Sequence, residues 1–210
     1  MIEKDFNFKT FSMGEYFRSV INSSDTHGEE SQFVTNLRKT LRAGHFVDDE
    51  TALGVIKNVV DSKVYGDFPG LILDGMPRTL PQAEKLHGMM GINLVVNFLN
   101  REDILLEKLM GRRVCPSCGT NYNVADINRD GYVMPPLAPK EDGICDHCPG
   151  VQLIIRDDDK ETIIKERMEI YRSKTEPIID FFKERDENKV VDFEAKLGKD
   201  DYPKLRKLLQ

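Results

Sequence analysis

The sequence predicts an α/β protein in which short parallel strands alternate with helices. Two apolar runs, "GLILD" ending at Asp74 and "INLVVNFL" ending at Leu99, have the length and composition of buried strands. Segments with helical periodicity separate such runs; one of them, "DETALGVIKNVVDSK", places Leu53, Ile56 and Val60 on one face. Strands that alternate with helices form parallel β-α-β units, so we expect a doubly wound parallel sheet.

Local signals predict the other elements in order. An extended piece ends at Phe11, and Ser12 and Glu15 have the spacing of a capping box that starts a helix. A second helix ends near Ala43, and Thr79 and Gln82 repeat the capping-box spacing after the first apolar run. "REDILLEKLMGR" has a helical stripe, and so does the long segment after residue 160, in which Pro177 predicts a break. "KVVDF" predicts a last strand and "DDYPKLRKLL" a last helix.

Length and composition exclude several classes of protein. A chain of 210 residues and 24.1 kDa is one domain, or a core with small inserted lobes. The net charge of −6 argues against a nucleic-acid-binding protein, and no apolar run approaches the ~20 residues of a membrane span. The first residues, "MIEKDFNFKTF", resemble neither a secretory signal nor a transit peptide, so the cytoplasm is the default expectation.

The segment from Val114 to about Val151 differs in composition and reads as an inserted lobe, because cysteine, proline and glycine rise and periodicity disappears. It holds all four cysteines as two CxxC pairs: Cys115, Cys118, Cys145 and Cys148. Two such pairs across a loop predict a tetrahedral, structural Zn²⁺ site with no open coordination position. Two disulfides are the alternative, disfavoured without a secretory signal. A nucleic-acid-binding zinc ribbon is disfavoured by nearby acidic residues, namely Asp126, Asp130, Glu141, Asp142 and Asp146.

Arginines stand at the boundaries of the lobe and of other elements: Arg18, Arg78, Arg112, Arg113, Arg156 and Arg167. Arginine binds phosphate oxygens in planar, bidentate geometry, so a converging group would indicate a phosphate site. For any one of them a surface ion pair is the alternative. Asp158 and Asp159 read most simply as first-turn acids that complement the dipole of the following helix.

Asp74 stands at the carboxyl end of a predicted parallel strand, where ligands bind in doubly wound sheets. A carboxylate in this place can hold Mg²⁺ through water. The alternative is that it is a turn residue before Gly75. Gln82 has a comparable alternative as the capping partner of Thr79.

Five ordered stretches resemble the adenylate kinase family. "LILDGMPRTLPQAEKL" is similar to its DGFPR-T-x-x-Q-A signature, and "FSMGEYFR" and "RAGHFVDDE" resemble its STGDxLR and GxLVxDE stretches. "GRRVCPSCGTNYNV…GICDHC" is similar to the zinc-bearing lid of the long form, and "RDDDKETIIKERMEIYRSKTEPIIDFF" to the segment that closes it. The lid loop is nearest to organellar members of plants and related lineages.

The resemblance implies a P-loop-kinase-like core (1–11, 61–111 and 152–210), an arm that binds the nucleoside monophosphate (12–60) and a mobile zinc lid (112–151). It implies Mg²⁺-dependent transfer of phosphate from ATP to AMP, giving two ADP, in a monomer. Its catalytic set would be Asp74, Arg78, Arg112, Arg156 and Arg167. Its AMP site would be Arg18, Val47, Gly75, Arg78 and Gln82. The ATP site would be Arg112 and Arg156, with Asp158 and Asp159 aiding lid closure.

Departures from the family pattern occur on the donor side and, at Met13, on the AMP side. The 210 residues contain no P-loop G-x-x-G-x-G-K, and only eleven residues precede Ser12. Met13 replaces a threonine of many members, and Lys108 stands where some have an arginine. Three hypotheses remain open: a truncated form of an active kinase, an AMP-binding relative that transfers nothing and acts as a sensor or scaffold, and a kinase for another nucleotide pair, such as a GTP:AMP phosphotransferase. With the natural N-terminus in doubt, mitochondrion and plastid are open beside the cytoplasm.

Overall fold

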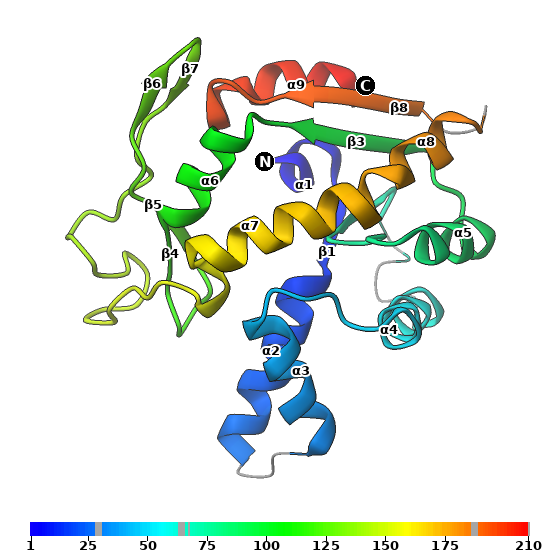
Figure 1. Cartoon of the computed structure of the whole chain (residues 1–210), viewed down its shortest axis with the longest axis horizontal. Coiled ribbons are helices and arrows are strands. Elements are labelled where there is room, and N and C mark those ends of the chain that lie inside the picture. The colour runs from blue at the N-terminus through cyan, green and yellow to red at the C-terminus, as the bar shows by residue number, and fades with distance from the viewer. Residues whose placement is uncertain (28–30, 63–65, 67, 186–188, 210) are drawn as a thin grey trace. The chain divides into compact units, whose positions relative to one another are not determined.

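The computed structural model describes residues 1–27, 31–62, 66, 68–185 and 189–209 (Figure 1). The chain divides into two compact units, and each is described by itself. Unit 1 consists of Met1–Val95 and Glu169–Val190, and unit 2 of Val96–Met168 and Val191–Gln210. The boundaries of these two units differ from those of the expected core, arm and lid. The division into core, arm and lid stays a prediction.

A parallel pair of strands organises unit 1. β1 (Lys9–Ser12) pairs in parallel with β2 (Leu71–Asp74), so that Ser12 lies opposite Asp74 at the carboxyl ends. The helices of this part are α1 (Ile2–Phe6), α2 (Met13–His27), α3 (Gln32–Arg42), α4 (Asp49–Asp61), α5 (Leu80–Met89) and α8 (Pro177–Lys183). The predicted α/β fold with parallel strands is confirmed.

The hydrophobic core of unit 1 uses the helix face that the sequence predicts. Ile56 on α4 has no exposed surface and Leu53 is buried, while Val60 is half-buried against the same cluster. Phe17 on α2 and Leu37 on α3 pack into this cluster, and the two helices lie side by side in Figure 1. A smaller cluster joins α5 to α8 through Ala83, Ile178, Phe181 and Phe182.

Unit 2 contains the lobe, in which sequence periodicity predicts no strands. The structure shows two antiparallel pairs of three-residue strands, β4 (Arg112–Val114) with β5 (Asn121–Asn123), and β6 (Ile127–Arg129) with β7 (Tyr132–Met134). Strands this short carry too few residues for a pattern of period two. The other elements of the unit are α6 (Glu102–Met110), the 3-10 turns η1 (Asp157–Asp159) and η3 (Gly198–Asp201), and α9 (Tyr202–Leu208). Ile104 on α6 packs against Ile127, Tyr132 and Met134 of the hairpin.

Three elements run across the boundary between the units: β3 (Leu94–Leu99), α7 (Glu161–Ile170) and β8 (Lys189–Glu194). β3 pairs with β8, so the described strands form four two-stranded sheets. A π-helical turn, η2 (Tyr171–Thr175), follows α7, and α8 begins at Pro177. The predicted break at Pro177 is therefore confirmed, since proline fits the first position of a helix.

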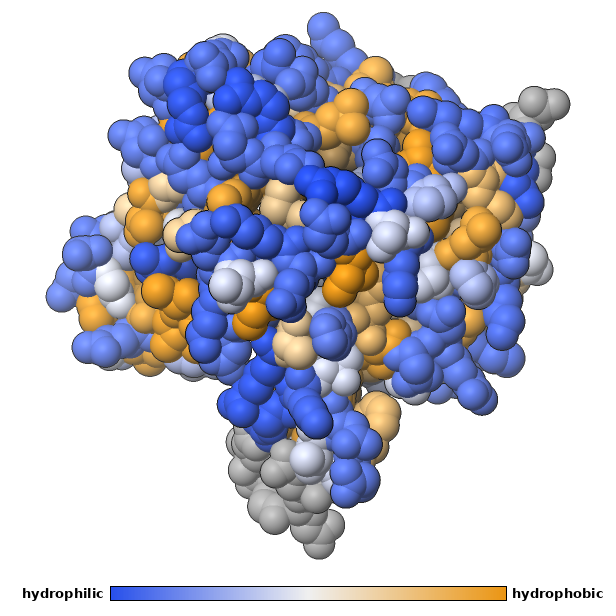
Figure 2. All heavy atoms as spheres, in the orientation of Figure 1, coloured by the Kyte–Doolittle hydropathy of each residue, from blue (hydrophilic) through white to orange (hydrophobic). Residues whose placement is uncertain are grey.

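One face of the molecule is largely hydrophilic (Figure 2). On the face shown in Figure 2, hydrophilic residues cover most of the area and hydrophobic ones emerge in small groups, in keeping with a charged share of 31%. Among the described residues, none of the helices combines the length and apolar character needed to cross a membrane.

Replacing Ile56 by alanine tests the contribution of the buried α4 face. The substitution removes a fully buried side chain and leaves a cavity, so we expect the free energy of unfolding to fall by about 2–5 kcal/mol. Urea unfolding followed by circular dichroism measures the change. Gly54→Ala on the same helix is the control, because a Cβ there meets no atom within 4 Å and alanine favours helix, so its stability should be equal or higher. Equal stability of Ile56→Ala and the wild type would contradict this account.

Candidate active site

The turn after β2 is shaped by Gly75. Gly75 has a φ of 74°, a left-handed conformation that glycine adopts without strain. The Nε of Arg78 donates to the Gly75 carbonyl oxygen at 2.9 Å, which brings the guanidinium back over the turn. A Cβ on Gly75 would lie 3.0 Å from an Arg78 terminal nitrogen, so both the backbone and the space require glycine here.

Asp74 is exposed at the carboxyl end of β2, as predicted. The Ser12 hydroxyl donates to its Oδ2 at 2.9 Å, so the two strand ends are joined by their side chains. The predicted capping role of Ser12 is thus replaced by a bond across the sheet edge. An exposed carboxylate at this edge suits the predicted contact with a hydrated cation.

Gln82 is 3% exposed, and its side chain is held at both ends. Its Oε1 accepts from the Arg78 backbone N–H at 2.7 Å, and its Nε2 donates to Asp49 Oδ1 at 2.8 Å. Thr79 caps α5 by accepting from the Gln82 N–H at 3.3 Å, so the predicted N-cap is confirmed. However, the Gln82 side chain reaches back to Arg78 and not to the Thr79 N–H that a capping box would use.

Asp49, on the first turn of α4, is a residue that sequence reasoning missed. Besides Gln82, the Thr79 hydroxyl donates to Asp49 Oδ1 at 2.9 Å. The Thr175 hydroxyl of the π-helical turn donates to the Arg78 carbonyl oxygen, also at 2.9 Å. Each of these three hydrogen bonds joins residues that are 30 or more positions apart in the sequence, so local spacing could not have indicated them.

The remaining residues expected at the AMP site also lie in unit 1. The Arg18 guanidinium folds back along α2 to within 3.2 Å of a Cβ built on Gly14. Val47 is half-buried against the main hydrophobic cluster. Its neighbour Phe46 stacks under the Arg78 guanidinium, with the ring centroid 5.0 Å away. The face of an aromatic ring favours a cation, so Phe46 helps to hold Arg78.

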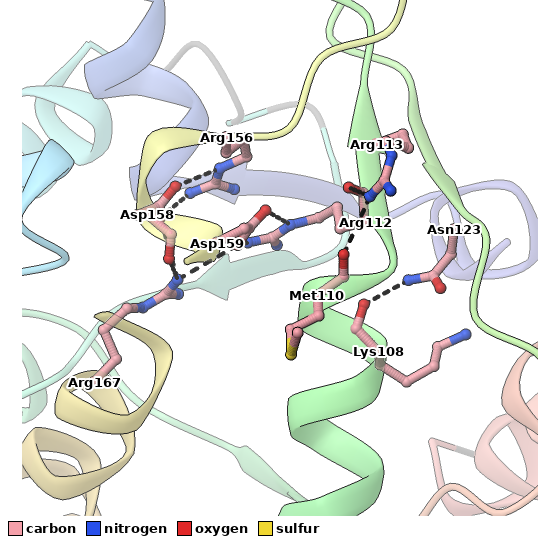
Figure 3. Close-up of polar contacts among 9 residues, drawn as sticks. All are labelled: Lys108, Met110, Arg112, Arg113, Asn123, Arg156, Asp158, Asp159 and Arg167. Carbon is pink, nitrogen blue, oxygen red and sulfur yellow. Dashed lines mark hydrogen bonds and ion pairs between the residues drawn. The ribbon is translucent and has the colours of Figure 1, made fainter. Parts of the chain in front are cut away.

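Three arginines of unit 2 converge on two aspartates, a group that we call the arginine cluster (Figure 3). Arg112 grips Asp159 and Arg156 grips Asp158, each through two nitrogens, with Nε–Oδ distances of 2.8 Å. Arg167 on α7 reaches Asp158 Oδ2 at 3.2 Å and Asp159 Oδ1 at 3.8 Å. The sequence predicted these arginines as candidates, and the fold brings them together. Arg113 differs, since it donates to the carbonyl oxygens of Met110 and Arg112.

The arginine cluster carries one positive charge in excess, in a partly dry environment. The Asp159 side chain has no exposed surface, and the three arginine side chains are 18–25% exposed. Burial lowers the pKa of the Arg167 guanidinium, and although Asp158 opposes this, Arg112 and Arg156 add to it. Burial would raise the pKa of Asp158, but Arg156, with Arg167 and Arg112, outweighs it and leaves the pKa below its ordinary value. A desolvated site with surplus guanidinium groups favours a further anion.

A small pocket in the same unit is lined by Lys108, by Met134, Pro135 and Leu137, and by the turn 197–200. Burial lowers the pKa of the Lys108 ammonium, outweighing the nearby Glu107.

The four cysteines meet as predicted. Their thiols are free, and the four sulfur atoms lie within 4.8 Å of one another. Two backbone turns present them: the Gly119 N–H donates to the Cys115 carbonyl oxygen at 3.0 Å, and the Val151 N–H to that of Cys148 at 3.1 Å. Cys145 Sγ also receives the His147 N–H at 3.4 Å and the Tyr122 hydroxyl at 3.6 Å. The group could hold a metal ion, and the free thiols do not support the disulfide alternative.

Comparison with known proteins identifies the family. Residues 1–187 match the family model described as adenylate kinase. The chain belongs to the adenylate kinase family. It is therefore a member of a family of phosphotransferases that act on nucleotides, and the resemblance inferred from the sequence motifs is confirmed.

Individual relatives differ in name and length. A protein of Plasmodium falciparum named GTP:AMP phosphotransferase is 36% identical over 96% of this chain and 85% of its own length. A protein of rice named probable adenylate kinase 6, chloroplastic, is 36% identical over 88% of this chain, which spans 65% of that relative. An adenylate kinase of Treponema denticola is 32% identical over 88% of this chain and 79% of its own length.

Asp158→Asn tests the charge pairing in the arginine cluster. Because the folded state lowers the pKa of Asp158, its ionised form stabilises the fold above the ordinary value of 3.8, and this contribution is lost as the pH falls through the folded-state pKa. We expect the variant to melt below the wild type from about pH 5 to 7, and the difference to shrink below about pH 4. Differential scanning fluorimetry across pH measures both. Asp157→Asn, at an exposed residue of the same turn, is the control, and a gap independent of pH would contradict the argument.

Proposed function

We propose that the chain catalyses reversible, Mg²⁺-dependent phosphoryl transfer from ATP to AMP, giving two ADP. The family membership supports the reaction class, and the arginine cluster is the observation that carries the proposal. Phosphoryl transfer concentrates negative charge on three oxygens, and catalysis consists mostly of positioning and charge stabilisation. Three converging guanidinium groups with surplus charge provide that stabilisation.

On the acceptor side, we assign Arg18 and Arg78 to the phosphate of AMP and Gln82 to its adenine, with the Val47 backbone and Gly75 lining the site. Bidentate grip by Arg78 suits a terminal phosphate, and Phe46 and Gly75 hold its guanidinium in place. Because Gln82 is nearly buried, a base reaches it only when the side chains that cover it move. Binding free energy can favour that minor conformation.

On the donor side, we assign Arg112, Arg156 and Arg167 to the phosphates of ATP and to the group in transfer. Phosphate oxygens can replace Asp158 and Asp159 as partners of these arginines, and the released aspartates are then available to hold the closed lid. We assign to Asp74 a contact with the water molecules around Mg²⁺. The cation, when bound, would neutralise phosphate charge. Closure around the nucleotides would exclude the water that otherwise hydrolyses ATP.

Two other functions have support of their own. The Plasmodium relative's name favours a GTP donor. The lack of a G-x-x-G-x-G-K loop in these 210 residues favours an AMP-binding protein with slow or no transfer, because backbone amides and a lysine normally cradle the donor phosphates. For the 210-residue polypeptide we propose impaired transfer. Among compartments, the rice relative's name favours the plastid.

A coupled ADP-formation assay across ATP/AMP and GTP/AMP, with AMP binding measured by calorimetry, distinguishes these functions. It is run on the 210-residue chain and on any longer form from the same reading frame. Turnover of ATP and AMP supports the proposal, turnover with GTP alone favours the second function, and AMP binding without turnover in both forms favours the third. Absence of both AMP binding and turnover would overturn the assignment.

Within that assay, Arg112→Ala tests the arginine cluster. Removing one guanidinium from the group that stabilises the transferring phosphoryl should lower kcat by about 10²–10³-fold. Arg113→Ala is the matched control: it is the next residue along β4, but it contacts backbone carbonyl groups and neither of the two aspartates. Where the active form shows equal losses for both variants, the assignment of the cluster is wrong.

We further propose that Cys115, Cys118, Cys145 and Cys148 hold a structural Zn²⁺. Four thiols within 4.8 Å fit tetrahedral coordination, with zinc–sulfur distances of about 2.3 Å and no open position for chemistry. We expect about one zinc per chain by elemental analysis, loss of most of it in Cys145→Ser, and a lower melting temperature after chelation. Asp142→Asn, at an exposed acid of the same lobe, should retain the metal. Zinc absent from the wild type would contradict the proposal.

A further inference from the structure

Asp49 accepts a hydrogen bond from the Gln82 side chain. Its Oδ1 receives both the Thr79 hydroxyl at 2.9 Å and the Gln82 Nε2 at 2.8 Å, so one carboxylate oxygen on α4 collects two donors from the start of α5. In the part of the chain that the structure describes, Gln82 makes its other side-chain bond through Oε1 to the Arg78 N–H. The amide is thus clamped between a carboxylate and a backbone donor.

This clamp permits one orientation of the amide. A carboxylate without its proton only accepts hydrogen bonds, and a backbone N–H only donates. Turning the Gln82 amide over would set its oxygen against Asp49 and its N–H group against the Arg78 N–H, two repulsive contacts in a nearly buried place. Both neighbours therefore agree on the same orientation, which removes the ambiguity that glutamine amides usually have.

The fixed amide offers a defined pattern to a ligand. In the described structure, one N–H of Nε2 and one lone pair of Oε1 stay outside the clamp, because each atom makes one of the two bonds it can make. Adenine presents an acceptor, N1, beside a donor, the N6 amino group, whereas hypoxanthine and guanine present N1–H beside O6. An amide that cannot turn over can match one of these edges and not the other.

We propose that Asp49 is a specificity-determining positioning residue: by fixing the Gln82 amide, it selects a 6-amino purine monophosphate over a 6-oxo one as the acceptor. This inference rests on the proposed contact between Gln82 and the acceptor base. It adds the residue that decides which base fits. Asp49 itself touches Gln82 and Thr79, and no role in the chemical step is assigned to it.

AMP and IMP are the probes, because they differ at this edge of the base alone. Calorimetric titration of the wild-type chain should show AMP bound at least about tenfold more tightly than IMP, since a site built around fixed polar groups rejects a mismatched partner. In Asp49→Asn the new side chain both donates and accepts, so one of the two contacts that oppose the turned amide is lost while the Arg78 N–H remains, and we expect the preference for AMP to fall by about threefold or more.

Asp48→Asn is the matched control. Asp48 is the neighbouring carboxylate and caps α4 by accepting from the Thr51 N–H at 2.8 Å, so the variant removes the same charge from the same turn. It should stay close to the wild type in stability, because asparagine caps helices about as well as aspartate, and it should keep the preference for AMP. Any general effect of charge on phosphate binding alters AMP and IMP equally and leaves their ratio unchanged.

The outcomes separate this inference from the proposed function. A preference that is unchanged in Asp49→Asn, or a wild type that binds AMP and IMP equally, overturns the role of Asp49 but leaves a monophosphate site. A wild type that binds neither nucleotide overturns both. If Asp49→Asn does not fold, nitrogen-15 spectra of the wild type decide instead. AMP should shift the Gln82 side-chain amide signals while IMP leaves them in place, and an amide that ignores AMP overturns the inference.

Discussion

A polar group withdrawn from water must find a partner, and this constraint organises both parts of the candidate site. In unit 2, Asp159 has no exposed side-chain surface, and Arg112 and Arg167 reach it. In unit 1, the amide of Gln82 is nearly buried and is held by Asp49 and by the Arg78 N–H. The Arg112–Asp159 and Asp49–Gln82 pairs join elements that are distant in the sequence, so satisfying the buried group also positions the residues expected to meet phosphate or base.

The same constraint predicts how the proposed site would respond to a ligand. Arginines that are tied to aspartates are pre-oriented, but a phosphate can compete for them because it offers more charge and more acceptor oxygens than a carboxylate. If the cluster binds phosphate as proposed, we expect its surplus positive charge to favour that exchange, and the burial of Arg167 to reduce screening by solvent.

Individual elements show how far sequence reasoning reaches. The buried face of α4, the strand that ends at Asp74, the cap at Thr79 and the break at Pro177 were all predictable, because each depends on residues within a few turns of one another. The strands of the lobe were not predictable, since three residues cannot establish a period. The two capping-box spacings mark helix starts correctly, but the side chains do not form the hydrogen bonds of a full capping box. The Ser12 side chain bonds to Asp74, and the Gln82 side chain bonds to Arg78 and Asp49.

By itself, the sequence determined the family, the identity of the arginines and the four clustered cysteines, because motif order and CxxC spacing are local and specific. The tertiary structure decided which side chains become partners. Arg112 and Asp159 are 47 residues apart, and Asp49 and Gln82 are 33 apart. The tertiary fold determines such pairs, because the free energy of a buried hydrogen bond depends on which donors and acceptors are brought together out of water. The spacing of the residues along the sequence does not reveal these pairs.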